Sequence, residues 1–216
     1  MYGIRKYFLV LLLFCSYSAF SQTVSTDSVK QRRVEVGISV FYYHPILSDL
    51  NKGFSEAEIN SGIRTWKDFD ISYMVLSTFG YRFNRWNQFA LQAGGSYLMH
   101  KRDIHKSYYY LLMFGGEYRF IPISRTRPTS DFWVSLGGGM IITEFYRSYD
   151  HNTSMYAFGS KYYVDAGVGI RVAVTQNVGI NFDLRYMFVP PMKFDNLGSE
   201  LKLNSFLGGI GFVVSL

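Results

Sequence analysis

The sequence is poor in cysteine, in charge and in long apolar runs. Its one cysteine, Cys15, lies near the N-terminus, so the rest of the chain has no disulfide framework, cysteine nucleophile or cysteine-ligated metal. Charged residues make up 18% of the 216 residues, below the roughly 25% of ordinary soluble domains. Beyond residue 21, no apolar run approaches the roughly 18 residues of a membrane-spanning helix. A helical membrane protein is therefore excluded.

The first 21 residues have the layout of a secretory signal peptide. Arg5 and Lys6 precede a short apolar core at residues 7–14, and small residues lead up to Ser21. This core is far shorter than the roughly 20 residues that a bilayer-spanning helix needs. We predict export with cleavage after Ser21, a signal peptide at 1–21, a periplasmic segment at 22–32 and one domain at 33–216.

Aromatic residues are abundant, at 19% of the chain, and apolar side chains recur at every second position. This is the period of a β-strand. None of the five prolines falls inside a predicted strand, as a sheet requires, because proline cannot donate to a ladder. The alternation predicts eight strands, at residues 34–40, 71–83, 89–99, 108–120, 132–142, 164–174, 178–188 and 206–216.

The connections between these strands differ in length at the two ends. Residues 84–87, 122–130 and 175–177 form the shorter connections on one side. On the other side lie the longer loops 45–68, 147–160 and 190–200, together with the short link 101–106. An even number of antiparallel strands, with tight turns at one end and long loops at the other, is typical of outer-membrane barrels. The predicted fold is an all-β, eight-stranded antiparallel up-and-down transmembrane β-barrel in a Gram-negative outer membrane.

A secreted barrel with an apolar interior is the competing design, but the apolar face holds more side chains than an eight-stranded interior accommodates. Turning Arg171 or Arg185 toward lipid near the bilayer midplane costs about 2–4 kcal/mol each. We therefore predict apolar side chains outward and charges inward, with Glu35, Arg82 and Gln92 on the inner face. A charge network is predicted to fill the lumen and leave no large pore: Glu117, Arg119, Asp165, Arg171, Asp183 and Arg185.

Neither a cofactor nor a metal is predicted. The glycines at 137–139 and at Gly167 and Gly169 lack the following helix that a phosphate-binding loop needs. The histidines are placed at the loop side without a spacing typical of a metal site: His44, His100, His105 and His151. No basic stripe or nucleic-acid motif is present, so nucleic acid is not a predicted partner.

An enzymatic alternative rests on His151, Ser154 and Glu144, which lie close together in sequence at the loop side. They include the residue types of a serine hydrolase, here one acting on lipid A. Their order and spacing differ from those of the outer-membrane deacylases. We therefore predict a protein that is not an enzyme.

Two loop features point to partners. Lys101, Arg102, Lys106 and Arg147 are predicted to form a cationic rim that contacts lipopolysaccharide phosphates. Loop 45–68 is predicted to fold as a short helix over the barrel mouth. Its apolar residues either pack on the barrel or form a candidate site for a protein partner.

Over residues 33–216 the chain resembles the small eight-stranded outer-membrane barrels of the OmpX and OmpA transmembrane-domain type and the related PorT-like barrels. The most specific feature is the last strand, where Phe206, Gly208, Ile210, Phe212, Val214 and Leu216 alternate. This strand resembles the signal read by the barrel assembly machinery, a predicted partner during insertion. Members of this class have diverse functions. The resemblance implies a structural or interaction role, with a PorT-like accessory of a secretion or surface-assembly machine as the alternative.

Overall fold

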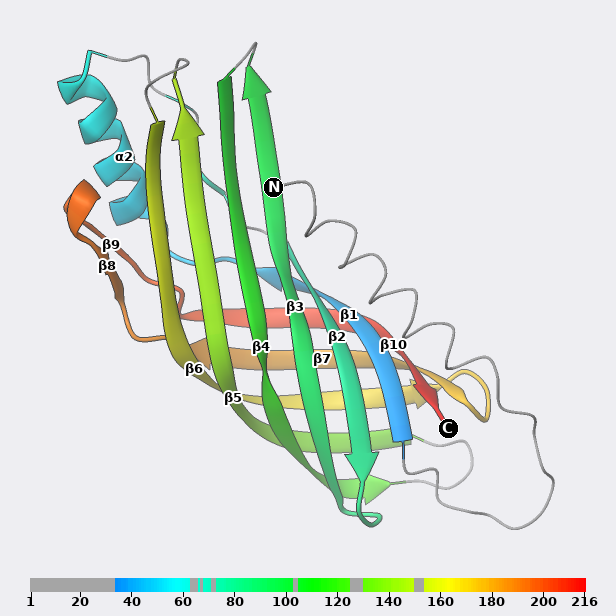
Figure 1. The fold of residues 1–216 in the computed structure, drawn as a ribbon. Coiled ribbons are helices and arrows are strands. Elements are labelled where there is room, and N and C mark those ends of the chain that lie inside the picture. The colour runs from blue at the N-terminus through cyan, green and yellow to red at the C-terminus, as the bar shows by residue number, and fades with distance from the viewer. Residues whose placement is uncertain are drawn as a thin grey trace.

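The chain forms a closed antiparallel barrel of eight strands (Figure 1). The computed structural model describes residues 34–62, 66, 68–70, 73–102, 105–124, 130–149 and 154–216, so the predicted segments 1–21 and 22–32 and His151 lie outside the described residues. The strand order around the barrel is β1-β10-β7-β6-β5-β4-β3-β2, which confirms the predicted all-β, eight-stranded antiparallel up-and-down barrel. The barrel strands are β1 (Val34–Tyr43), β2 (Tyr73–Arg82), β3 (Asn87–Arg102), β4 (His105–Ser124), β5 (Ser130–Ser148), β6 (Ser154–Ala173), β7 (Val178–Phe188) and β10 (Ser205–Ser215).

One end of the barrel, the turn end, carries tight hairpins. In the β2–β3 hairpin the backbone N–H groups of Trp86 and Asn87 donate to Asn84 Oδ1, over 2.8 and 3.0 Å. Thr175 Oγ1 accepts in the same way from the backbone of the β6–β7 turn. Such side-chain acceptors stabilise short turns because they satisfy N–H groups that no strand partner reaches.

The opposite end, the loop end, carries α2 (Ser48–Asn60) and a small hairpin of β8 (Met192–Phe194) and β9 (Ser199–Leu201), joined by η1 (Asp195–Leu197). Leu47, Leu50 and Phe54 are buried, at a spacing that puts them on one face of a helix. The helix ends before Gly62, which has a φ of 66° in the left-handed region that glycine adopts readily. Among the described residues no helix is long and apolar enough to cross a membrane.

The strands are staggered around the ring. Following the cross-strand partners of Val40 through β2 leads to Ser160 on β6, and following them through β10 leads to Ile170, ten residues away. A stagger of this kind goes with strands that tilt relative to the barrel axis.

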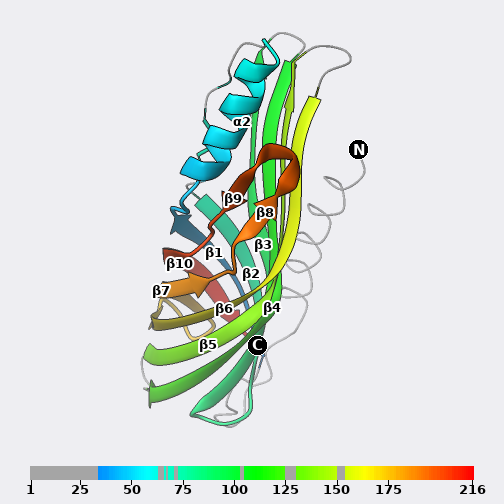
Figure 2. The same ribbon diagram turned by 90° about the vertical axis from the view of Figure 1, so that its left-hand side faces the viewer.

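Strands β3 to β6 are longer than predicted and rise beyond the ring as a four-stranded wall (Figure 2). β6 pairs with β7 only as far as Val164↔Phe188, but with β5 as far as Ser148↔Ser154. The prediction of a loop at 147–160 was therefore wrong, and 101–106 lies mostly in the β3–β4 hairpin. The added strand length is stabilised from within, because Met192 and Phe194 of β8 pack against Gly159.

The interior has two chemically different halves. The half near the turn end is polar, whereas the half near the loop end is filled by Phe41, Leu111, Ile141 and Phe145, together with Leu50 from α2. The prediction of a lumen filled by charge is thus wrong for the loop-end half. There α2 and the β8–β9 hairpin cover the mouth, and burying apolar side chains away from water is favourable.

Candidate functional site in the lumen and at the barrel mouth

The polar half of the lumen contains two clusters of charged side chains. The turn-end cluster consists of Glu35, Arg82, Gln88, Asp131, Arg171 and Asn181. The mid-lumen cluster consists of Glu117, Arg119, Asp165, Asp183 and Arg185. Ten of these residues are buried, and Arg82, at 11% side-chain exposure, is nearly so.

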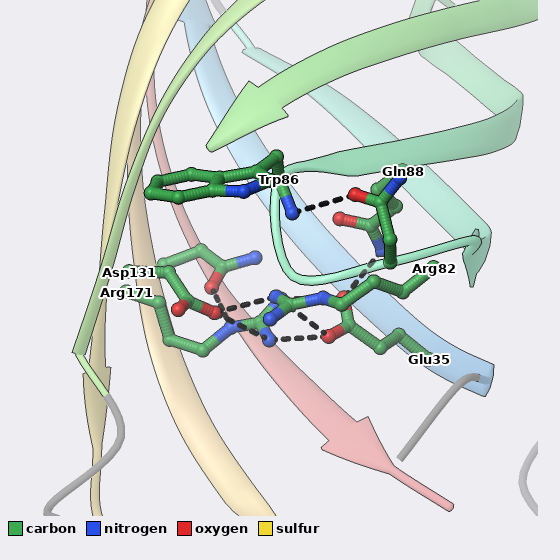
Figure 3. Close-up of polar contacts among 8 residues, drawn as sticks. Glu35, Arg82, Trp86, Gln88, Asp131 and Arg171 are labelled. Atoms are coloured by element: carbon green, nitrogen blue, oxygen red, sulfur yellow. Dashed lines mark hydrogen bonds and ion pairs between the residues drawn. The ribbon is translucent and has the colours of Figure 1, made fainter. Parts of the chain in front are cut away.

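Glu35 is the centre of the turn-end cluster (Figure 3). Arg171 donates two parallel hydrogen bonds to it, Nη1 to Oε1 over 2.5 Å and Nη2 to Oε2 over 2.7 Å. Gln88 Nε2 donates to Glu35 Oε2 over 2.5 Å, and Arg82 Nη2 donates to Asp131 Oδ2 over 2.6 Å. Bidentate hydrogen bonds between a guanidinium and a carboxylate are among the strongest hydrogen bonds in proteins. The cluster thereby joins β1, β2, β3, β5 and β6 across the lumen.

Arg185 is the centre of the mid-lumen cluster. Its guanidinium nitrogens lie 3.1 Å from Asp183 Oδ1, 3.3 Å from Glu117 Oε2 and 3.5 Å from Asp165 Oδ2. Arg119 Nη2 lies 2.9 Å from the same Glu117 oxygen. Buried charges must be paired in this way, because an isolated charge out of water is costly. The ion pairs and the neighbouring side chains occupy this level of the lumen.

Five of the six residues predicted as one charge network come together in the mid-lumen cluster. The sixth, Arg171, belongs to the turn-end cluster. Sequence reasoning missed Asp131 and Gln88, which lie just before the predicted starts of their strands. Extending the alternation by one position would have placed both on the inner face, in phase with Trp133 and Gln92.

At the mouth, a buried ion pair fastens α2 to the barrel wall. Glu58 Oε1 accepts from Arg147 Nη1 over 2.8 Å and from the Tyr149 hydroxyl over 2.5 Å, and both charged side chains are fully buried. The Arg147 guanidinium also lies 4.4 Å from the ring centre of Phe69 and 4.9 Å from that of Phe54. Burial raises the pKa of the Tyr149 hydroxyl above its ordinary value, and the hydrogen bond to Glu58 raises it further. We call Glu58, Arg147 and Tyr149 the helix latch.

The latch corrects the prediction that Arg147 belongs to an exposed cationic rim. β5 continues to Ser148 instead of ending before Arg147, so the alternation that turns Phe145 inward turns Arg147 inward too. The prediction of a short helix over the mouth is confirmed. Its residue Asn51 is further tied to the backbone of Phe69 by two hydrogen bonds, of 2.9 and 3.1 Å.

The other predicted rim residues lie together in the β3–β4 hairpin, where Lys101 is paired in register with Lys106, whereas the predicted hydrolase residues Glu144 and Ser154 lie apart. Lys106 is exposed on β4, whereas the side chains of Lys101, Arg102, His100 and His105 lie outside the described part of the chain. Glu144 accepts a hydrogen bond from Tyr108 over 3.0 Å on the outer face of β5 and is paired in register with Phe158, four residues along from Ser154. Within the described ranges, no group of three His, Cys, Asp or Glu residues is placed to hold a metal.

Two clefts open at the mouth. One, of about 380 Å³, lies between α2 and the hairpin and is lined by Asp49, Lys52, Glu56, Asp195 and Glu200 among others. The second, of about 320 Å³, lies beside β6 and is lined by Gly159, Ser160, Lys161, Pro191, Met192 and Lys193. The first has charges of both signs, and the second has only positive charge.

Of the comparisons with known proteins, the one with Ail supports the architecture. No family model and no curated protein matches the chain. Among solved structures, Ail, the attachment invasion locus protein of Yersinia pestis, has 12% sequence identity and a TM-score of 0.50, over 85% of this chain and 99% of Ail. Neisserial surface protein A has 14% identity and a TM-score of 0.49, over 85% of this chain and 97% of the other. The N-terminal β-barrel domain of Pseudomonas aeruginosa OprF has 13% identity and a TM-score of 0.43, over 86% and 98%. All three are small eight-stranded outer-membrane barrels, and at 12% identity the likeness to Ail concerns the fold alone.

Proposed function

We propose that this chain is a closed outer-membrane barrel that acts through its loop-end surface, as a structural or interaction protein. The observation that carries the proposal is the filling of the lumen. The turn-end cluster, the mid-lumen cluster, the apolar side chains and α2 follow one another along the barrel axis. A barrel of eight strands has room for a filled core or one small ligand, so transport through a wide pore is not its function.

The outer surface supports a membrane location. Large apolar side chains face outward around the ring, among them Ile38, Leu91, Ile170, Leu184 and Ile210, each 40–54% exposed. Exposing so many to water is unfavourable, whereas lipid accepts them. A closed barrel also pairs its backbone polar groups, which a hydrocarbon environment requires.

The wall formed by β3 to β6 is expected to stand on the outer side of the membrane. β6 has 20 residues, which span roughly 50 Å along the barrel axis at about 3.3 Å per residue and a tilt of 35–45°. The apolar band of such barrels is about 25 Å tall. About half of β6 therefore rises above the band, together with α2 and the hairpin that pack on the wall.

The proposal includes three partners. Lipid and lipopolysaccharide surround the barrel, and Lys101, Arg102 and Lys106 supply the loop-end cations for lipopolysaccharide phosphates. The barrel assembly machinery reads the alternating strand β10 during insertion. A protein partner binds the loop-end surface.

A role as a PorT-like accessory of a secretion or surface-assembly machine is the second candidate function. The ordered wall favours it, since α2 is fixed to the wall by the helix latch and so presents a preformed surface. We propose further that the chain is not an enzyme. Ser154 and Glu144, two residues of the hydrolase alternative, do not lie together. Mass spectrometry of lipid A from cells with and without the gene tests this part of the proposal, and a difference in acyl chains would contradict it.

Two experiments test the proposed function. Outer membranes from expressing cells are run on gels with and without boiling, and a folded barrel is expected to migrate differently from the boiled chain; identical migration contradicts the barrel. Affinity purification in mild detergent then tests the interaction role. A reproducible complex with secretion or assembly proteins favours the accessory function, whereas recovery of the chain alone favours a structural role in the membrane.

A further inference from the structure

The upper part of β6 is an open strand edge. β7 leaves β6 at Phe188 and is followed by Pro190 and Pro191, which have no backbone N–H and so do not continue a ladder. From residue 157 to 163, β6 pairs with β5 on one side, and no described strand pairs with it on the other. The side chains of β8 pack on the inner face at Gly159, so they do not replace a neighbouring strand.

The backbone groups that face this edge follow from the neighbouring hairpin. Val174 N–H donates to Val178 O over 2.8 Å, so even-numbered residues direct their backbone groups toward the β7 side, because these directions alternate along a strand. The carbonyl oxygen of Tyr163, an odd-numbered residue, faces Gly138 on β5, which agrees. The N–H and C=O groups of Phe158, Ser160 and Tyr162 therefore face the open edge.

The cleft of about 320 Å³ lies directly beside this edge, and its charge is one-sided. Lys161 and Lys193 line it, and no acidic residue does. Within the described ranges neither lysine takes part in an ion pair, unlike Lys52, which pairs with Glu56, and Lys202, which pairs with Asp49. An open edge next to a positively charged cleft suits an extended chain with negative side chains.

We propose that the β6 edge at residues 157–163 binds an extended, acidic segment of a partner protein, which adds to the wall as a further strand. The partner's backbone pairs with Phe158, Ser160 and Tyr162, and its carboxylates meet Lys161 and Lys193. This deepens the proposed interaction role and rests on it. A second copy of the chain in the same membrane does not fit. Strands tilted by 35–45° and related by an axis along the membrane normal cross at about twice that angle, too steeply to pair.

The test uses the purified full-length barrel in detergent micelles and a nine-residue synthetic peptide of alternating valine and threonine that carries two glutamates. Residue-resolved amide hydrogen exchange is measured by NMR. In the free protein the amides of Phe158, Ser160 and Tyr162 are expected to exchange at least tenfold faster than those of their odd-numbered neighbours. The peptide at millimolar concentration is expected to slow these three amides at least tenfold. If the three amides are already protected without peptide, or stay unprotected with it, the proposal is overturned.

Variants separate backbone pairing from charge attraction. Ser160→Pro removes one edge N–H while leaving the ladder to β5 intact, and it is expected to weaken peptide affinity about fivefold or more. Lys161→Gln combined with Lys193→Gln is expected to weaken it about threefold or more, whereas Lys52→Gln leaves it unchanged. A peptide N-methylated at alternate residues is expected not to bind. If the N-methylated peptide binds with the same affinity as the unmethylated peptide, strand addition is overturned and the cleft is a simple anion site. Unchanged heat-dependent gel migration shows that each variant still forms the barrel, so failure here is distinct from failure of the proposed barrel.

Discussion

The helix latch makes a sharp prediction. Replacing Glu58 by glutamine removes the buried ion pair between Glu58 and the Arg147 guanidinium, whose side chains are both fully buried. Removing one member of a buried ion pair typically costs about 3–5 kcal/mol. Because the barrel ladder does not depend on α2, this cost is expected to fall on the docking of the helix. The equilibrium between open and docked α2 is then expected to shift by a factor of roughly 10² to 10⁴.

Trypsin cleavage after Lys52 measures this opening. Lys52 lies within α2, and cleavage requires the helix to unfold locally, so its rate follows the open population when closing is fast. Glu58→Gln is expected to accelerate cleavage by that factor without altering heat-dependent migration. The double variant Glu58→Leu with Arg147→Met is expected to restore slow cleavage, since an apolar pair often replaces a buried ion pair without loss. An unchanged rate in Glu58→Gln would refute the latch.

Three further outcomes are expected. Gly169→Ala places a methyl group against the Trp133 ring, and we expect it to lower the free energy of unfolding in urea by about 1–3 kcal/mol. The added methyl group of the control Gly208→Ala meets nothing within 4 Å, and we expect this variant to change the free energy of unfolding little. Deleting α2 is expected not to open a channel in planar bilayers, because both charge clusters still fill the polar half of the lumen; a steady conductance would contradict this. The raised pKa of Tyr149 keeps its hydroxyl protonated in the docked state, so its contribution to docking is fully present below pH about 10 and is lost as pH rises above it. Tyrosinate absorbance, compared between the chain and its Tyr149→Phe variant, follows the ionisation of Tyr149; ionisation at its ordinary pKa would contradict the hydrogen bond to Glu58.

The alternation of apolar and polar residues was sufficient to predict the barrel and its inside-out orientation. Charges such as Arg171 and Arg185 fix the register, because a shift by one residue would turn every one of them toward lipid. The same period, continued past residue 142, would have turned Phe145 and Arg147 inward. The residues from Arg147 onward are mostly polar, as is typical of a loop, so no local pattern indicates that the strand continues through them.

The pairing of Glu58 with Arg147 was not predictable from a local pattern. The two residues are 89 positions apart, and only the packing of α2 against the wall brings them together. The division of the lumen into polar and apolar halves has a similar cause. The inner face of β1 carries Gly37 and Ser39 before Phe41, and that of β10 carries Leu207 before Gly209 and Gly211. Whether Phe41 or Leu207 meets water depends on the helix and hairpin that cover the mouth.

The central claim is that the barrel is closed and its lumen filled, so that function resides on the loop-end surface. The most direct test is electrical recording of the purified, refolded chain in planar lipid bilayers. Fully inserted barrels are expected to give no stable channel openings across a range of voltages. A reproducible, long-lived conductance that scales with the number of inserted barrels would contradict the account.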